Sequence, residues 1–154
     1  MFFQSLNIVQ LFGHPIANIG QIVAIEKVQC YFTRRLFFDK VFSYSERLFL
    51  LNWQPLETRR IKADLIMYYK IIHRLVDLEP ENFFTLSDFP STTGHLYKII
   101  LKNFINNTFA NSFGNRQVNC WNALPTKIVS ASSLSNFKSK LKTFDLTPFL
   151  NGRL

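Results

Sequence analysis

The stretch over residues 54–76, QPLETRRIKADLIMYYKIIHRLV, constrains the fold of this chain more than any other. Pro55 suits the first turn of a helix, where its missing N–H costs nothing, and Glu57 favours the positive end of the helix dipole. Pro80 disfavours helical geometry at the residue before it, so the pattern ends there. We predict one long central helix over residues 55–76. Its apolar face holds Ile61, Leu65, Tyr68, Ile72, Leu75 and Val76, and its opposite, basic face holds Arg59, Lys62, Lys70 and Arg74.

A second apolar stripe at helical spacing lies upstream of the central helix, in residues 19–36. It predicts a helix whose apolar side chains enter the core, with basic side chains away from the centre of the stripe. Gln29 lies inside this stripe, so its amide would be half-buried and would need a hydrogen-bond partner. We interpret Gln29 as a core contact rather than as a ligand. The stripe consists of Ile22, Ile25, Val28, Phe32 and Leu36.

Capping residues mark three more helices. Ser43 and Glu46 form a capping box, in which each side chain can satisfy a free backbone N–H of the other residue. Ser112 and Ser133 are candidates for the N-cap of two later helices. The predicted helices cover residues 44–51, 112–122 and 133–144. Between the first of these and the central helix, Asn52 and Trp53 turn the chain, and Trp53 is expected to fill that corner.

The fold class we predict is a small, mainly α domain built around the long central helix. This single domain covers residues 19–147, after an irregular lead-in over residues 1–18 and before a tail over residues 148–154. Residues 77–111 are interpreted as a loop with a short helical turn near Phe83 and Phe84. Within that loop, alternation of apolar and basic residues favours a short β-hairpin near 95–105.

Composition bears on partners and compartment. The 154 residues include 17 Phe, and the net charge of +8 favours polyanions such as RNA or DNA. Only two cysteines occur, without the spacing of a zinc site, so we expect no metal, reduced thiols and an intracellular protein, nuclear or cytoplasmic and not secreted. Residues 1–25 carry no charged side chain, but polar residues interrupt them, so we expect neither a signal peptide nor a membrane span.

No arrangement of residues in the sequence indicates catalysis. It contains no glycine-rich phosphate loop, no nucleophile elbow and no pair of carboxylates at helical spacing with a nearby histidine. His14, His73 and His95 lie far apart and are typical of surface or hydrogen-bonded histidines. We therefore expect a protein that is not an enzyme and that uses no cofactor.

Four stretches carry a recognisable order of motifs. In order and spacing they resemble the C-terminal region that follows the polymerase domain in reverse transcriptases of LINE-type, non-LTR retrotransposons. The resemblance covers nearly the whole chain. The stretches are IEKVQCYFTRRLF (25–37), SYSERLFLLNWQPLETRRIKADLIMYYKIIH (43–73), TTGH (92–95) and SFGNRQVNCWNALPTKIVSASSLSNFKSKL (112–141).

The resemblance implies an accessory region and not the polymerase itself. A polymerase of this kind needs an Asp-Asp metal-binding pair, which this sequence lacks, so the resemblance places that chemistry upstream of such a region. The sequence also departs from the pattern. Cys30 and Tyr31 stand where such proteins usually carry basic residues, and Thr93 stands where Arg is usual before Gly94.

Two functions remain open at this point. The first is auxiliary binding of the RNA or DNA backbone, through contacts that would be sequence-independent and weakened by salt. The second is an interaction module that docks on a polymerase thumb, or an inactive truncated copy, which the excess of phenylalanine favours. A contiguous cationic face would indicate binding, whereas an apolar patch ringed by charge would indicate docking. The candidate nucleic-acid-binding residues are Arg34, Arg35, Arg59, Lys62, Lys70, His73, Arg74 and Arg116.

Overall fold

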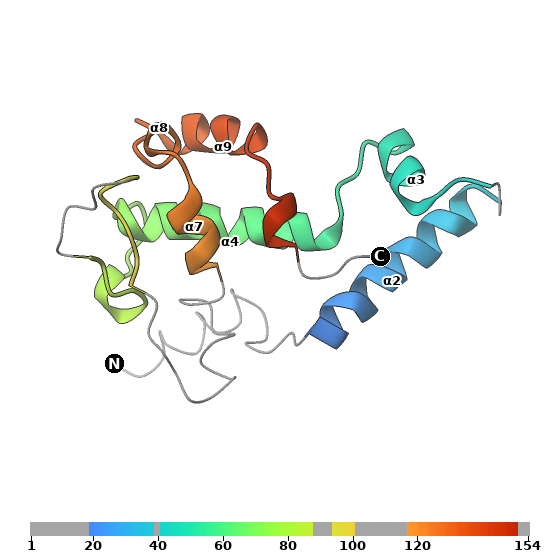
Figure 1. Cartoon of the computed structure of the whole chain (residues 1–154), viewed down its shortest axis with the longest axis horizontal. Coiled ribbons are helices and arrows are strands. Elements are labelled where there is room, and N and C mark those ends of the chain that lie inside the picture. Colours follow the sequence, from blue (N-terminus) through green and yellow to red (C-terminus); the bar gives the residue numbers. More distant parts are fainter. Residues whose placement is uncertain (1–18, 39–40, 88–93, 101–116, 151–154) are drawn as a thin grey trace. The chain divides into compact units, whose positions relative to one another are not determined.

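The structure is a computed structural model that describes residues 19–38, 41–87, 94–100 and 117–150 (Figure 1). These residues are mainly helical, which confirms the predicted fold class. The elements are α2 (Ile19–Leu36), α3 (Tyr44–Leu50), α4 (Leu56–Ile72), the 3-10 turn η1 (Pro80–Asn82), α7 (Val118–Ala123), α8 (Thr126–Val129), α9 (Leu134–Lys142) and the 3-10 turn η2 (Thr147–Phe149).

Local capping chemistry sets the starts of α3 and α9. The predicted capping box is present, because the Ser43 N–H donates to the Glu46 carboxylate at 2.7 Å and the Glu46 N–H donates to the Ser43 hydroxyl at 3.3 Å. The Ser133 hydroxyl likewise accepts from the Asn136 N–H at 3.2 Å. Hydroxyl and carboxylate groups at these positions satisfy N–H groups that the first helical turn leaves unpaired.

The central helix α4 ends four residues before the predicted boundary. His73 and Arg74 form a turn in which Arg74 has a φ of 52°. The N–H of Leu75 donates to the Lys70 carbonyl at 2.7 Å, and the N–H of Arg74 donates to the Ile71 carbonyl at 3.0 Å. This is the bonding of a Schellman motif, which closes a helix on a left-handed residue. The prediction that Leu75 lies on the apolar face was wrong, since it is 53% exposed beyond the helix.

The described residues belong to two compact units. Residues 63–145 contain the core unit, and residues 17–62 with 146–154 contain the N-terminal unit. The boundary falls within α4, after Lys62. Of the 19 apolar side chains that are buried among the described residues, 16 belong to the core unit. The packing of the N-terminal unit therefore depends on interactions other than the burial of apolar side chains.

Aromatic rings from helices far apart in sequence form the centre of the core unit. Trp121 on α7 is fully buried, and its ring centroid lies 5.8 Å from that of Tyr68 on α4 and 6.3 Å from that of Phe137 on α9. The Trp121 indole N–H donates to the Tyr97 carbonyl at 2.7 Å. Tyr69 stacks on Phe137 at 4.3 Å, so α7 and α9 both pack beside the C-terminal part of α4 (Figure 1).

The described part of the expected hairpin near 95–105 is an extended segment over residues 94–100, and residues 101–105 lie outside the described residues. Ile99 forms an antiparallel bridge with Leu86, upstream of the predicted range. The Asn122 side chain completes the pairing, because it accepts from the Ile99 N–H at 3.0 Å and donates to the Ile99 carbonyl at 2.8 Å. The partner of this segment is thus set by a side chain on α7.

Two further boundaries were only partly anticipated. Val118–Ala123 is helical, as expected for the end of the 112–122 segment, while the proposed cap Ser112 lies outside the described residues. Pro125 ends this helix but also begins α8, which was not predicted. A proline is compatible with both roles because the first turn of a helix does not need its N–H.

Candidate functional site

A buried carboxylate fastens the start of α4 in the N-terminal unit. Glu26 on α2 is only 4% exposed and accepts hydrogen bonds from the N–H groups of Leu56 and Glu57, both at 3.2 Å. The Tyr44 hydroxyl on α3 donates to the same carboxylate. A negative charge is favourable at this positive end of the helix dipole. Burial and the bond to Glu26 raise the pKa of Tyr44, so the phenol stays a donor.

Gln29 extends this contact by one helical turn. Its amide nitrogen donates to the Tyr44 hydroxyl at 3.1 Å and to the Gln54 carbonyl at 3.3 Å, and its amide oxygen accepts from the Arg59 guanidinium at 2.6 Å. Gln29 is 7% exposed. It therefore has the partners that its predicted interior position required.

A second polar contact joins α2 to α3 through Arg47. This side chain is 4% exposed, and its guanidinium donates to the Thr33 hydroxyl at 3.2 Å and to the carbonyl groups of Phe42 and Cys30. Several aligned acceptors of this kind compensate a buried cation for lost hydration. Sequence reasoning missed both Glu26 and Arg47. The available signal was the i, i+3, i+7 spacing of Glu26, Gln29 and Thr33, which places three polar side chains on one face of a helix.

The buried face of α2 is therefore not the predicted one. Glu26, Gln29 and Thr33 are buried, whereas four of the five residues of the expected apolar stripe are turned outward by about a quarter of a turn. The side chain of the fifth, Ile22, lies outside the description. That prediction was wrong, because α3 and the start of α4 pack on the polar face through hydrogen bonds. We call the outward stripe the α2 apolar face. It consists of Ile25 (46% exposed), Val28 (69%), Phe32 (51%) and Leu36 (45%).

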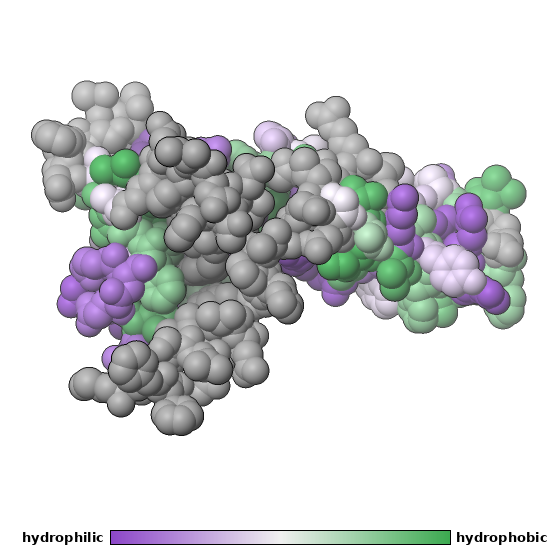
Figure 2. Space-filling view, turned by 90° about the horizontal axis from the view of Figure 1, so that it is seen from below, coloured by the Kyte–Doolittle hydropathy of each residue, from purple (hydrophilic) through white to green (hydrophobic). Residues whose placement is uncertain are grey.

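Exposed apolar side chains gather in the N-terminal unit. Of the 14 large apolar side chains that are exposed among the described residues, 11 belong to this unit. Trp53 does not close its corner fully, since it remains 43% exposed and its ring lies parallel to that of Phe32 at 6.2 Å. Figure 2 shows apolar surface in green mixed with hydrophilic surface in purple at the right of the view, where α2 and α3 lie. The N-terminal unit therefore leaves many of its own apolar side chains exposed, whereas the core unit buries most of its own.

The predicted basic residues of the N-terminal unit are accessible but partly engaged. Arg34 and Arg35 are exposed on α2, and the Arg35 guanidinium donates to the Tyr31 hydroxyl at 2.7 and 3.1 Å. Arg59 is exposed and donates to Gln29, as described above. The Lys62 ammonium donates to the Gln54 side chain at 3.0 Å.

The predicted basic residues of the core unit behave differently from one another. His73 is held inside the unit, because its Nε2 lies 3.0 Å from the Val129 carbonyl, to which it donates, and its ring packs against Tyr69 and Tyr97. That nitrogen is not available to phosphate. Lys70 is half-buried, and Arg74 is exposed in the turn after α4. Arg116 lies outside the described residues.

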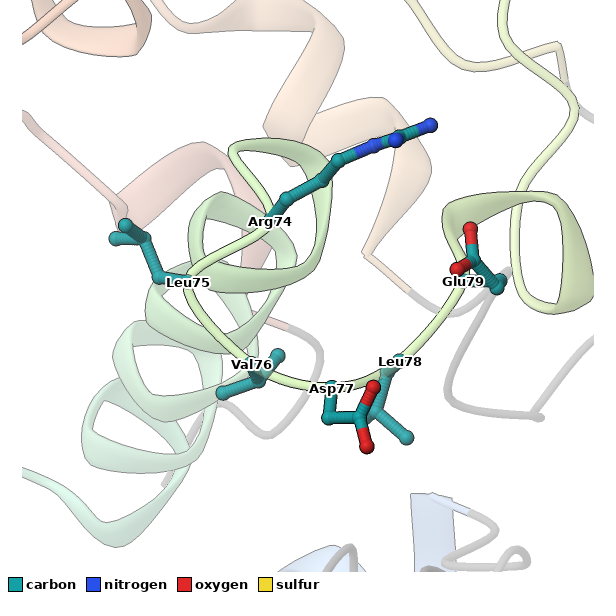
Figure 3. A pocket seen from close by; sticks show the side chains of 6 residues that line it. All are labelled: Arg74, Leu75, Val76, Asp77, Leu78 and Glu79. Atoms are coloured by element: carbon teal, nitrogen blue, oxygen red, sulfur yellow. The ribbon is translucent and has the colours of Figure 1, made fainter.

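A surface pocket follows α4 and is formed by one short loop (Figure 3). Arg74 begins this loop and Glu79 ends it, and Asp77 lies between them. In Figure 3 the side chains do not converge on one point. A lone loop with diverging charges has neither a nucleophile nor an arranged acid and base, so it does not have the features of an active site.

Other site classes find no support in the part of the chain that the structure describes. Across 19–38, 41–87, 94–100 and 117–150, no three His, Cys, Asp or Glu side chains are grouped so as to hold a metal ion. No helix within these ranges is both long enough and apolar enough to cross a bilayer. Burial raises the pKa of the Cys120 thiol to about 12, which makes it unreactive. No protein-family model, curated protein or solved structure matches the chain.

His95 is a buried group with an unusual hydrogen-bond balance. It is 2% exposed, its Nε2 lies 3.0 Å from the Trp121 carbonyl, and its Nδ1 has no hydrogen-bond partner. Burial lowers the pKa of His95, and the nearby Lys98 lowers it further. Gly94 before it has a φ of 98°, which a residue with a side chain rarely adopts. Gly94 and His95 of the TTGH stretch therefore place a neutral imidazole against the ring of Trp121, with the two ring centroids 5.7 Å apart.

This geometry predicts that acid destabilises the fold through His95. The unfolded chain takes up a proton near pH 6.5, whereas the folded chain does so only at lower pH, so the free energy of unfolding should fall as pH decreases below about 6.5. The measurement is urea unfolding followed by circular dichroism from pH 7.5 to pH 5. The variant His95→Gln, which keeps a donor for the Trp121 carbonyl, should flatten this pH dependence. An unchanged slope would show that His95 does not carry it.

Proposed function

We propose that this chain is a non-catalytic docking module of the kind that follows the polymerase domain in non-LTR reverse transcriptases, and that the α2 apolar face packs on that polymerase domain. The observation that carries the proposal is the exposure of four apolar side chains along one side of α2, 45% to 69% each. Contiguous exposed apolar surface of this kind marks an interaction site more often than a free surface.

The energetics suit a partner that is linked in the same polypeptide. Burying the exposed half of one such side chain would contribute about 1 kcal/mol to the free energy of docking. The four side chains together would contribute on the order of 4 kcal/mol. Association between separate molecules costs at least about this much, so a free complex held by these side chains alone would be weak. A domain joined by a short linker has an effective concentration in the range of about 1 mM, which favours the contact more than a dilute separate partner would.

The polar network beneath the face supports docking rather than chemistry. The polar groups of Glu26, Gln29 and Arg47 form hydrogen bonds to neighbouring helices. These bonds hold α2 against α3 and the start of α4. A rigid helix offers a preorganised surface, which reduces the entropy lost on binding. We expect the purified chain to incorporate no nucleotides on a primed template, because the described residues contain no group of three or more His, Cys, Asp or Glu side chains that could hold a catalytic metal ion.

Replacing Val28 with Asp should disrupt docking without unfolding the chain. Val28 is 69% exposed, so the carboxylate would be solvated in the free chain but would lose water when the face is covered. We expect at least about a tenfold loss of affinity for a separately expressed polymerase domain of a LINE-type reverse transcriptase, measured by a titration at concentrations up to about 1 mM, the effective concentration that a linker supplies. If transcript mapping finds such a domain in frame upstream of Met1, that domain is the preferred probe.

The matched control for this experiment is Leu96→Asp in the core unit. Leu96 is 75% exposed, so it has an accessible apolar side chain similar to that of Val28 but does not belong to α2. Its replacement should leave the affinity within a factor of about two of wild type, a difference of less than about 0.5 kcal/mol. Equal losses in both variants, or no binding by wild type, would contradict docking through α2.

A second candidate function is binding of the RNA or DNA backbone. The specific observation in its favour is that Arg34, Arg35, Arg59 and Arg74 are all exposed. Replacing Arg34 and Arg35 with Gln removes two charges and keeps helix propensity. If both touch phosphate, the slope of log affinity against log salt should shrink by roughly 1.4 units for single strands and roughly 1.8 units for duplex. Fluorescence anisotropy with labelled oligonucleotides measures this slope.

A parallel variant separates the two units in this test. Lys70→Gln with Arg74→Gln removes two charges from the core unit, so a slope change there would place the phosphate contacts around the end of α4. Loss of affinity should be similar for unrelated sequences, because phosphate contacts carry no sequence information. If wild type fails to bind even at low salt, this second candidate is removed.

A further inference from the structure

The exposed charged side chains of α2 are all basic. They are Lys27, Arg34 and Arg35. Two carboxylates of the N-terminal unit, Glu26 and Glu57, are buried at 4% and 7% exposure. Among the described residues of the N-terminal unit, the only exposed acid is Glu46, which the capping box engages, whereas the basic side chains that reach the surface are Lys27, Arg34, Arg35, Arg59, Arg60 and Lys62.

We infer that the surface that covers the α2 apolar face is a protein groove of apolar residues edged by Asp and Glu. This inference rests on the proposed docking function and adds the chemistry of the partner. The apolar floor would receive Val28 and Phe32, and the acidic edge would meet Arg35 and Lys27. Complementary charge of this kind selects the partner and orients its approach, while the apolar contact holds it.

The arrangement of charge on α2 favours a groove over a lipid surface. At 100° per residue, Arg35 and Tyr31 border the apolar face on one side, with Lys27 beyond them. On the other side the face adjoins the buried Glu26 and Gln29, against which α3 and the start of α4 pack. A helix that lies in a bilayer surface is rich in Lys and Arg across its polar face. On α2, the polar side chains of Glu26, Gln29 and Thr33 are instead buried against neighbouring helices. Arg35 borders the apolar face on one side, and Arg59, which donates to Gln29, adds a cation on the other, so both can meet an acidic rim.

A second copy of this chain fits the face poorly. In a two-fold contact each copy presents the same patch, so Arg35 and Arg59, which lie beside the face, would add like charge from both copies to one contact. Like charges brought together in this way oppose association. Glu46 is held at the start of α3, where its carboxylate accepts from the Ser43 N–H and hydroxyl, both at 2.7 Å. The complementary charge must come from a different surface.

Selection from a random library of 16-residue peptides displayed on phage would test the chemistry of the partner. Against the full wild-type chain, we expect enriched peptides to carry apolar residues at helical spacing and more Asp and Glu than Lys and Arg. Against the charge-reversed variant Lys27→Glu, Arg35→Glu, the enriched charge should change sign. A selected acidic peptide should bind this variant at least about tenfold more weakly than wild type, and its binding to wild type should weaken with salt.

The controls separate failure of this inference from failure of docking. Val28→Asp should enrich no apolar peptide, while Leu96→Asp should select the same peptides as wild type, and circular dichroism should show that all variants keep their helices. Apolar peptides without excess acid would overturn the inference and leave docking standing. No enrichment over the Val28→Asp background would overturn both. Flotation of the chain with phosphatidylserine vesicles, or dimers in sedimentation, would also overturn the inference if Val28→Asp abolished it.

Discussion

Replacing Trp121 with Ala should lower the free energy of unfolding by about 3–5 kcal/mol, the range expected when a large aromatic side chain is removed from a packed core. Trp121 is fully buried and contacts rings from two other helices, Tyr68 on α4 and Phe137 on α9. The change also leaves the Tyr97 carbonyl without its indole donor. A loss of this size is comparable to the whole stability of many domains, so the core unit is expected to unfold at low urea.

Trp53→Ala is the matched control for this result. Trp53 has the same side chain but is 43% exposed and has one aromatic neighbour, Phe32. Its removal should cost about 1 kcal/mol, since roughly half of its apolar surface is already in water. Urea unfolding monitored by circular dichroism at 222 nm compares the two variants without relying on tryptophan fluorescence. Equal losses for the two would contradict the assignment of Trp121 as the centre of the core unit.

Replacing Glu26 with Ala should lower the free energy of unfolding by about 2–4 kcal/mol. The loss of a helix-capping acceptor alone costs about 1 kcal/mol, and leaving buried donors unpaired adds to it. Three donors lose their acceptor, namely the N–H groups of Leu56 and Glu57 and the hydroxyl of Tyr44. Because α2 would then be held less firmly against α3 and the start of α4, affinity for a docking partner should fall as well.

A double-mutant cycle with Tyr44→Phe tests whether Glu26 acts through this network. The two changes should be non-additive by about 0.5–3 kcal/mol, as is usual for groups that share a hydrogen bond. Lys27→Ala is the control, since this neighbouring side chain is exposed and its removal should change stability by less than about 0.5 kcal/mol. Additive effects, or a Glu26 variant as stable as the Lys27 variant, would show that the buried carboxylate does not hold the N-terminal unit together.

Glu26 and Trp121 both belong to stretches on which the proposed resemblance to reverse transcriptases rests. Glu26 lies in IEKVQ and Trp121 in VNCWNALP. In this structure each has a packing or capping role, and so does His95 in TTGH. These roles give a physical reason for the residues to occur together in one chain. In the proposed accessory module, such motifs would maintain the fold and the exposed surface would make the interaction.

Short-range chemistry was sufficient to predict where most helices lie. The stripe over residues 19–36 predicted α2 with its observed bounds, Ile19–Leu36. The Ser43–Glu46 capping box and the cap at Ser133 marked α3 and α9, because such caps involve residues within one turn of each other. The short α8 and the end of α4 at Ile72 were missed. The latter depends on Arg74 adopting a left-handed conformation, which favours glycine and gave no signal in the sequence.

The sequence by itself determined the helical class, the positions of the caps and which side chains share a face of α2. Only the tertiary structure decided which face is buried. Periodicity shows which residues share a side of the helix, but it does not show what packs on that side. Arg47 and the N–H groups at the start of α4 supplied hydrogen bonds to Thr33 and Glu26, respectively, over separations of 14 to 31 residues. The hydrogen-bonded polar face therefore became interior, and the apolar face was left exposed.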